Sequence, residues 1–73
     1  MPPLPVVSGK QAAAAFEKRG WFFDRWSGSH MIYKHADKRL SLSIPNHRVL
    51  DRGLLRRLIR DSGISVEEFT RDL

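Results

Sequence analysis

The sequence predicts an α+β fold in which one helix, three antiparallel strands and two further helices follow one another. Two short turn sequences, Ser27-Gly28-Ser29 and Ala36-Asp37-Lys38, separate three runs that are rich in strand-forming residues. A capping-box pattern precedes an alanine-rich segment, and two apolar stripes of helical period lie near the end. Strands joined by tight turns pair antiparallel, so we expect one three-stranded sheet packed on the helices.

The first helix is expected to run from Ser8 to about Arg19. Ser8 suits the N-cap position, and Gln11 three residues later completes a capping box. Gly20 suits the left-handed position that ends a helix. Residues 1–7 contain three prolines and should form an extended lead-in to a single domain over residues 1–73.

The three strands are expected at residues 21–26, 30–35 and 39–44. Alternation in the first places Trp21 and Phe23 on one side, opposite Phe22, Asp24 and Trp26. In the second we assign Met31 and Tyr33 to the core, which leaves His30 and Lys34 on the open face. In the third, three apolar side chains should point inward: Leu40, Leu42 and Ile44.

Two helices should close the chain. The first, at about residues 53–62, has an apolar stripe of Leu54, Leu55, Leu58 and Ile59, and Gly63 should end it. The second starts at Ser65, with Glu68 as its capping-box partner. Its buried edge should consist of Val66, Phe69 and Leu73.

Charge is distributed unevenly along the chain. The net charge is +5, and between His30 and Arg60 eight Lys and Arg stand against two Asp, a net +6. A basic segment of this kind indicates a polyanion or an acidic protein as partner. A solvated basic surface without a partner is the alternative, and the charge alone leaves these possibilities open.

Several classes of protein are disfavoured by what the chain lacks. Without cysteine there is no disulfide framework and no thiolate metal site. No apolar run reaches membrane-spanning length, and no signal-peptide pattern follows Met1. We therefore expect a cytoplasmic protein that does not bind membranes.

The two last helices also have the order of a helix-turn-helix unit. The second of them carries Glu67, Glu68 and Asp72 against Arg71 alone, and acidic side chains are unfavourable next to phosphates. We therefore expect this pair to be structural, and the protein not to bind DNA by itself.

Histidines are the main candidates for chemistry. His30, His35 and His47 have no helical i, i+4 spacing with a carboxylate partner, so we expect no metal site and no cofactor. Metal-independent acid–base chemistry remains possible, because the 2′-hydroxyl of RNA supplies its own nucleophile. One imidazole with basic side chains nearby could then act on RNA. The plain alternative is that His30 is a surface histidine beside a turn.

From Val7 to about Phe69 the sequence resembles the HicA family of bacterial toxins. The matching pieces are short, but they occur in the same order and spacing: Ser8-Gly9-Lys10, Gly20, Gly28-Ser29-His30-Met31-Ile32-Tyr33-Lys34-His35, Pro45-Asn46-His47, Gly53-Leu54-Leu55, Gly63-Ile64-Ser65 and Glu67-Glu68-Phe69. The resemblance implies a double-stranded-RNA-binding-domain-like α-β-β-β-α fold, to which this chain adds a C-terminal helix. It also implies an mRNA interferase, a small endoribonuclease that blocks translation, and a HicB-type antitoxin that masks its site.

His30 matches the histidine that is catalytic in this family. We predict that Lys34, the second residue after His30 on the same strand face, binds the scissile phosphate. Other basic residues should follow the RNA backbone, unless they form a solvated helix face: Arg39, Arg48, Arg52, Arg56 and Arg60. A non-catalytic RNA-binding module is the alternative function. The antitoxin should be acidic where it covers His30, because that surface carries most of the +6.

Overall fold

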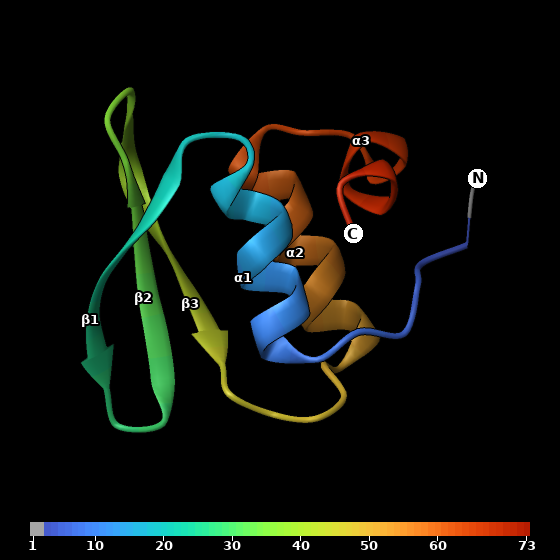
Figure 1. Cartoon of the computed structure of the whole chain (residues 1–73), viewed down its shortest axis with the longest axis horizontal. Coiled ribbons are helices and arrows are strands. Elements are labelled where there is room, and N and C mark those ends of the chain that lie inside the picture. The colour runs from blue at the N-terminus through green and yellow to red at the C-terminus, as the bar shows by residue number, and fades with distance from the viewer. Residues whose placement is uncertain (1–2) are drawn as a thin grey trace.

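The computed structural model describes residues 3–73 and has the predicted order of elements. They are α1 (Gly9–Glu17), β1 (Trp21–Ser27), β2 (His30–His35), β3 (Lys38–Pro45), α2 (Arg52–Ser62) and α3 (Val66–Arg71). The strands form one antiparallel sheet in the order β1-β2-β3. The helices all lie on one side of this sheet, and its other face is open (Figure 1). The α-β-β-β-α fold with an added C-terminal helix is therefore confirmed.

Helix α1 has the predicted N-cap but is shorter than expected. Ser8 Oγ accepts a hydrogen bond from Gln11 N–H at 3.0 Å, and the Gln11 side chain accepts one from Ser8 N–H at 2.9 Å. The helix ends at Glu17 rather than near Arg19, and Gly20 has a φ of +93°. Because this φ is unfavourable for residues with a Cβ, Gly20 allows the chain to turn directly into β1.

The core lies between the inner face of the sheet and the helices. Met31 and Tyr33 are buried there, as predicted. Phe16 of α1 and Phe69 of α3 are fully buried, with ring centroids 5.2 Å apart. The Tyr33 hydroxyl donates to Glu17 Oε2 at 2.8 Å, and burial, with help from this bond, raises the pKa of Tyr33 to about 12.

A β-bulge in β1 makes one prediction for this strand wrong. Phe23 is opposite Tyr33 and Arg25 is opposite Ile32, so Asp24 is an extra residue in the ladder. Beyond the bulge the alternation is reversed, and Trp26 is opposite the core residue Met31. Trp26 therefore shares a face with Phe23, against whose ring it packs edge to face at 5.9 Å.

A second irregularity explains why Leu40 is 46% exposed although we expected it in the core. Leu42 is opposite Tyr33 and Lys38 is opposite His35. Three residues of β3, 39–41, therefore stand opposite the single residue Lys34. Leu40 lies inside this irregular stretch without a paired partner, so its side chain is not held in the regular alternation with Leu42.

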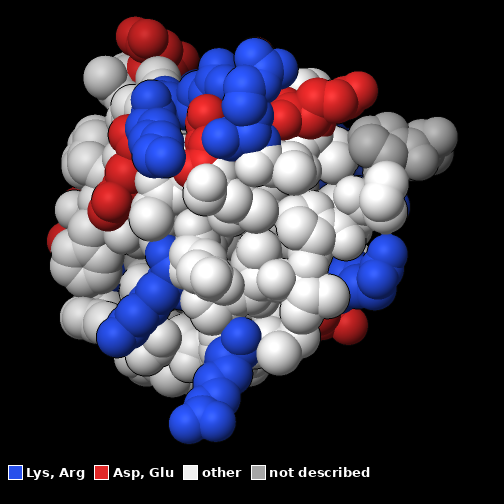
Figure 2. Space-filling view, turned by 45° about the vertical axis from the view of Figure 1, so that its right-hand side comes forward, with Lys and Arg blue, Asp and Glu red and all other residues white. Residues whose placement is uncertain are grey.

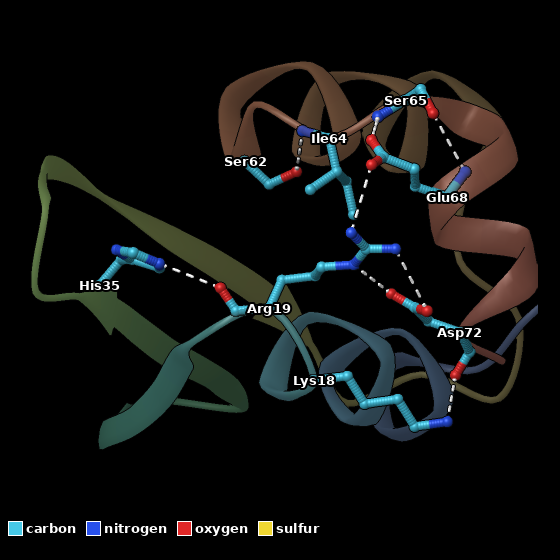
Figure 3. A network of polar contacts seen from close by, with 8 residues as sticks. All are labelled: Lys18, Arg19, His35, Ser62, Ile64, Ser65, Glu68 and Asp72. Atoms are coloured by element: carbon cyan, nitrogen blue, oxygen red, sulfur yellow. Dashed lines mark hydrogen bonds and ion pairs between the residues drawn. The ribbon is translucent and has the colours of Figure 1, made fainter.

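Helix α3 is attached to the end of α1 by charged side chains (Figure 3). Arg19 Nε lies 2.6 Å from Asp72 Oδ2, and Arg19 Nη1 lies 3.2 Å from Glu68 Oε2. Lys18 Nζ donates to the Asp72 carbonyl at 2.7 Å. Leu73 is 48% exposed, so its predicted burial is wrong, because the helix ends at Arg71 and only Phe69 is buried.

The turn after β1, the end of β3 and the start of α1 are joined at one end of the molecule. Asn46 N–H donates to the Ser29 carbonyl at 3.0 Å, and Gly9 N–H donates to the His47 carbonyl at 2.9 Å. A Cβ on Gly9 would lie 2.0 Å from the Pro45 carbonyl oxygen. Only glycine allows α1 to approach the chain this closely.

Candidate active site

His30 is the first residue of β2, the central strand of the sheet. Ser27 of β1 and Pro45 of β3 are its neighbours across the two ladders. The preceding turn contains Gly28 at a φ of +59°, with no other atom near the position of a Cβ. His30 is therefore held by strands on both sides, and its side chain is exposed.

Ser43 fixes the His30 ring. His30 Nδ1 and Ser43 Oγ are hydrogen-bonded at 2.9 Å. The serine hydroxyl can accept from Nδ1–H or donate to bare Nδ1, so it can serve either tautomer. Nε2 makes no hydrogen bond within residues 3–73 and remains available to a substrate. Alternation with Leu42 and Ile44 indicates an outward position for Ser43, but it gives no sign of this contact.

The open face of the sheet is formed by rows of residues opposite one another. Arg25, Ile32 and Ser43 form the middle row, and Phe22 is opposite Lys34 in the next. Ile32 is 8% exposed although it lies away from the core, so the side chains around it cover it. We refer to Phe22, Arg25, His30, Ile32, Lys34 and Ser43 as the open face.

Arg25 is nearer to His30 than Lys34 is. Arg25 is diagonal to His30 across the ladder, a Cα separation of about 7–8 Å. Lys34 lies four residues along β2 from His30, a Cα separation of about 13 Å. Lys34 therefore shares the predicted face but is not next to His30. Arg25 Nη1 bonds Asp24 Oδ2 at 2.6 Å, which leaves other guanidinium donors free.

The remaining predicted RNA-binding residues are exposed but do not lie together. Arg39 is in the irregular part of β3 opposite Lys34, and Arg48 follows β3 at the end nearer His30. Arg52, Arg56 and Arg60 run along α2, which packs on the covered side of the sheet. The net +6 between His30 and Arg60 is thus divided between two sides of the molecule.

In an oblique view that brings the side of α3 forward (Figure 2), charges of both signs are mixed. Figure 2 shows Lys and Arg interleaved with Asp and Glu along its top and a middle area without charged side chains. This view has no continuous basic surface. A polyanion would therefore find less charge complementarity here than on a surface of one sign.

The other two histidines differ from His30. His35 Nδ1 accepts from Asp37 N–H at 3.1 Å, so Nε2 carries the proton and donates to the Arg19 carbonyl at 3.0 Å. With both nitrogens bonded and its ring against Trp21, His35 is structural. His47 is exposed in the loop after β3, and its carbonyl accepts from Gly9.

Two negative findings apply to the part of the chain that the structure describes. Within residues 3–73 no group of three or more His, Cys, Asp or Glu is placed to hold a metal ion. No helix in that range is long and apolar enough to cross a membrane.

Arg25 and Ser43 were missed by the sequence analysis as site residues. Both lie in neighbouring strands, and only the register shows that they are diagonal to His30. The one available signal was the outward position of Ser43 in the alternating third strand. The bulge at Asp24 concealed the position of Arg25.

Comparison with known proteins identifies the family. A search of curated proteins finds no match to this chain. A family model described as the HicA toxin of bacterial toxin–antitoxin systems matches residues 9–64. The match extends from the first residue of α1 to the residue after Gly63, and it includes the whole sheet and His30. The chain belongs to the HicA family of bacterial toxins.

Proposed function

We propose that this toxin is an mRNA interferase, a metal-independent endoribonuclease in which His30 is the catalytic acid or base. The observation that carries the proposal is the position of His30. Its Nδ1 is bonded to Ser43, and its Nε2 is directed to no other group of residues 3–73. The substrate is mRNA, which places the activity in the cytoplasm, and residues 1–73 act as one toxin domain.

The reaction needs one proton acceptor beside the RNA. Neutral His30 takes the proton of a 2′-hydroxyl through Nε2 while that oxygen attacks the adjacent phosphorus. The bond to the 5′-oxygen of the next nucleotide breaks, and this oxygen takes a proton from solvent water as it leaves, while protonated His30 later returns its proton to solvent. The products are a 2′,3′-cyclic phosphate and a 5′-hydroxyl. No external nucleophile and no metal ion is required.

Ser43 and Arg25 would assist in different ways. When Ser43 Oγ accepts from Nδ1–H, the proton is held on that nitrogen and Nε2 is the basic one. Arg25 is the cation nearest to His30 on the open face, and it would stabilise the negative charge that grows on the phosphate. Lys34 is too far along the strand to bind the same phosphate without reaching back.

A HicB-type antitoxin would inhibit the enzyme by covering His30. Family membership supports a toxin–antitoxin partner, and the exposed basic residues favour an acidic docking surface. Because Arg56 and Arg60 belong to α2, a partner that covers only the open face would not need to contact them. The proposal therefore assigns masking to the open face rather than to the α2 arginines.

The alternative is a non-catalytic RNA-binding module, and an RNA cleavage assay distinguishes the two. Wild-type protein is compared with His30→Ala and with His47→Ala, a matched control at an exposed histidine. We expect His30→Ala to lower the cleavage rate by about 10²–10⁴, and His47→Ala to retain activity. Cleavage should persist in excess chelator. An intact substrate with wild type, or activity that depends on added divalent ions, would overturn the proposal.

A further inference from the structure

Phe22 is a half-exposed aromatic residue of β1 that has no aromatic neighbour among the described residues. It is 50% exposed on the open face, and no aromatic ring within residues 3–73 contacts it. The other exposed aromatic residues of β1 have partners. Phe23 and Trp26 pack edge to face at 5.9 Å, and Phe23 also packs on Tyr33 at 5.9 Å. Phe23 and Trp26 thus pack against other rings on the core side of β1, whereas Phe22 lies on the opposite face without such a ring.

We propose that Phe22 and Lys34 form a nucleotide subsite for single-stranded RNA, in which Phe22 stacks on a base and Lys34 binds a phosphate. The two residues are directly opposite each other on β1 and β2, and both are exposed. An aromatic ring beside an ammonium group matches the two parts of a nucleotide that every sequence shares. The subsite rests on the proposed function, since it would hold the strand that His30 cleaves.

The distance to His30 defines which part of the RNA the subsite binds. About 13 Å separates the Cα atoms of Lys34 and His30, so one phosphate does not contact both groups in extended positions. Ile32 lies between them and is covered by its neighbours, which gives the open face a continuous floor. A strand that follows β2 would place one phosphate at His30 and a neighbouring nucleotide on Phe22.

The base must be unpaired to stack on Phe22. Bases inside a duplex are already stacked on one another, and proteins read double-stranded RNA mostly by shape and by backbone contacts. Exposed aromatic residues on a sheet are instead typical of single-strand recognition. The chemistry of the open face therefore favours single-stranded RNA over a duplex.

Binding can be measured without cleavage by using a 2′-O-methylated RNA oligonucleotide, which lacks the attacking hydroxyl. We expect Phe22→Ala to weaken binding of the single strand by about tenfold, within the range found for one stacked base. Phe22→Trp should retain affinity because it keeps the stacking surface. Trp26→Ala is the matched control, an exposed aromatic residue of the same strand on the other face, and should bind like wild type.

The contribution of Lys34 can be measured separately, from the salt dependence of RNA affinity. Removal of one phosphate contact to a single strand reduces the slope of log K against log salt by about 0.7. We expect this reduction for Lys34→Gln and no change of slope for Phe22→Ala. Unchanged circular dichroism and thermal unfolding of each variant would show that the fold is intact.

The binding and cleavage results together distinguish a failure of the proposed subsite from a failure of the proposed enzymatic function. If wild type cleaves RNA but Phe22→Ala and Lys34→Gln bind the methylated strand as Trp26→Ala does, the subsite is wrong and the proposed function stands. If the two variants lose affinity while wild type cleaves nothing, the subsite stands without the enzyme. Equal losses on duplex RNA, or a loss of antitoxin binding alone, would also contradict a single-strand subsite.

Discussion

The open face and the contact between α1 and α3 carry similar cations in opposite arrangements. At the helix contact Arg19 bonds both Asp72 and Glu68, and its side chain is 32% exposed. On the open face His30 and Lys34 are exposed on one strand, and His30 bonds only a neutral serine. Cations that join elements of the fold are matched by carboxylates. On the open face Lys34 has no carboxylate partner within residues 3–73, and Arg25 bonds only the neighbouring Asp24, so both keep donors available to a phosphate.

The largest expected effect on stability is at the close contact between the start of α1 and the end of β3, next to His30. Gly9→Ala would place a Cβ 2.0 Å from the Pro45 carbonyl oxygen, and Pro45 is opposite His30. We expect destabilisation of about 1–3 kcal/mol, as for other overpacked sites, measured by urea unfolding. RNA cleavage should fall as well, because β3 shifts beside His30.

Gly53→Ala is the matched control for Gly9→Ala. Its Cβ would meet only Asp51 Oδ2, at 3.3 Å, and Gly53 lies in α2, where alanine is the better helix former. We expect little change or a small gain in the free energy of unfolding. Equal destabilisation by both substitutions would show that the close approach of Gly9 has no special role.

A smaller effect, on the cleavage rate, is expected for Ser43, the residue of the open face that is hydrogen-bonded to His30. Ser43→Ala removes one neutral hydrogen bond to His30, worth about 1 kcal/mol, so the cleavage rate should fall about fivefold. The kcat should change more than the KM, since in the proposed reaction Ser43 positions the base and does not bind RNA. Ser43→Thr should restore activity. Ser41→Ala, at an exposed serine of the same strand, should have no effect; an equal loss there would contradict the assignment.

The smallest effect is expected in the pH dependence of stability, through the contact between α1 and α3. The hydrogen bond from Arg19 holds the pKa of Asp72 below its usual range, and bonds at the Ser65 cap lower the pKa of Glu68. Lowered pKa values stabilise the fold above the unfolded pKa, about 4. This contribution is lost as the pH falls through the folded pKa values. We therefore expect α3 to loosen from α1 below about pH 4.

Urea midpoints measured as a function of pH test this contact. Asp72→Asn should lower the midpoint at neutral pH and make its decrease in acid less steep. Thr70→Ala is a control at an exposed position of the same helix, although it removes a bond to the Val66 carbonyl. An acid dependence that is identical in wild type and Asp72→Asn would contradict a stabilising role for the Arg19 contact.

Elements with local signals could be predicted from the sequence. The capping boxes at Ser8 and Ser65 and the stop at Gly63 are formed as expected, because each depends on residues within one turn. The second strand has the predicted bounds, His30–His35, because turn residues flank it. The irregularities in β1 and β3 had no such signal. The first reversed the face of Trp26, and the second left Leu40 exposed instead of in the core.

The candidate site could be predicted only in part for the same reason. His30 and Lys34 are on one strand, so alternation was enough to place both on the open face. Arg25 and Ser43 come next to His30 through the register of two ladders, which a bulge in β1 alters. The arginines of α2 were predicted to share a surface with His30 because they contribute to the same net charge of +6. A net charge does not show on which side of the fold each residue lies.

The chemistry of the cleaved RNA ends directly tests the proposal that His30 activates the 2′-hydroxyl of the RNA. RNA cut by wild-type protein in excess chelator is analysed for its new termini, with His30→Ala in parallel. We expect one new end with a 2′,3′-cyclic phosphate, or its hydrolysis product, and the other with a 5′-hydroxyl. We expect almost no cleavage by His30→Ala. New 5′-phosphate ends would mean attack by water, and they would contradict a reaction in which His30 activates the 2′-hydroxyl of the RNA.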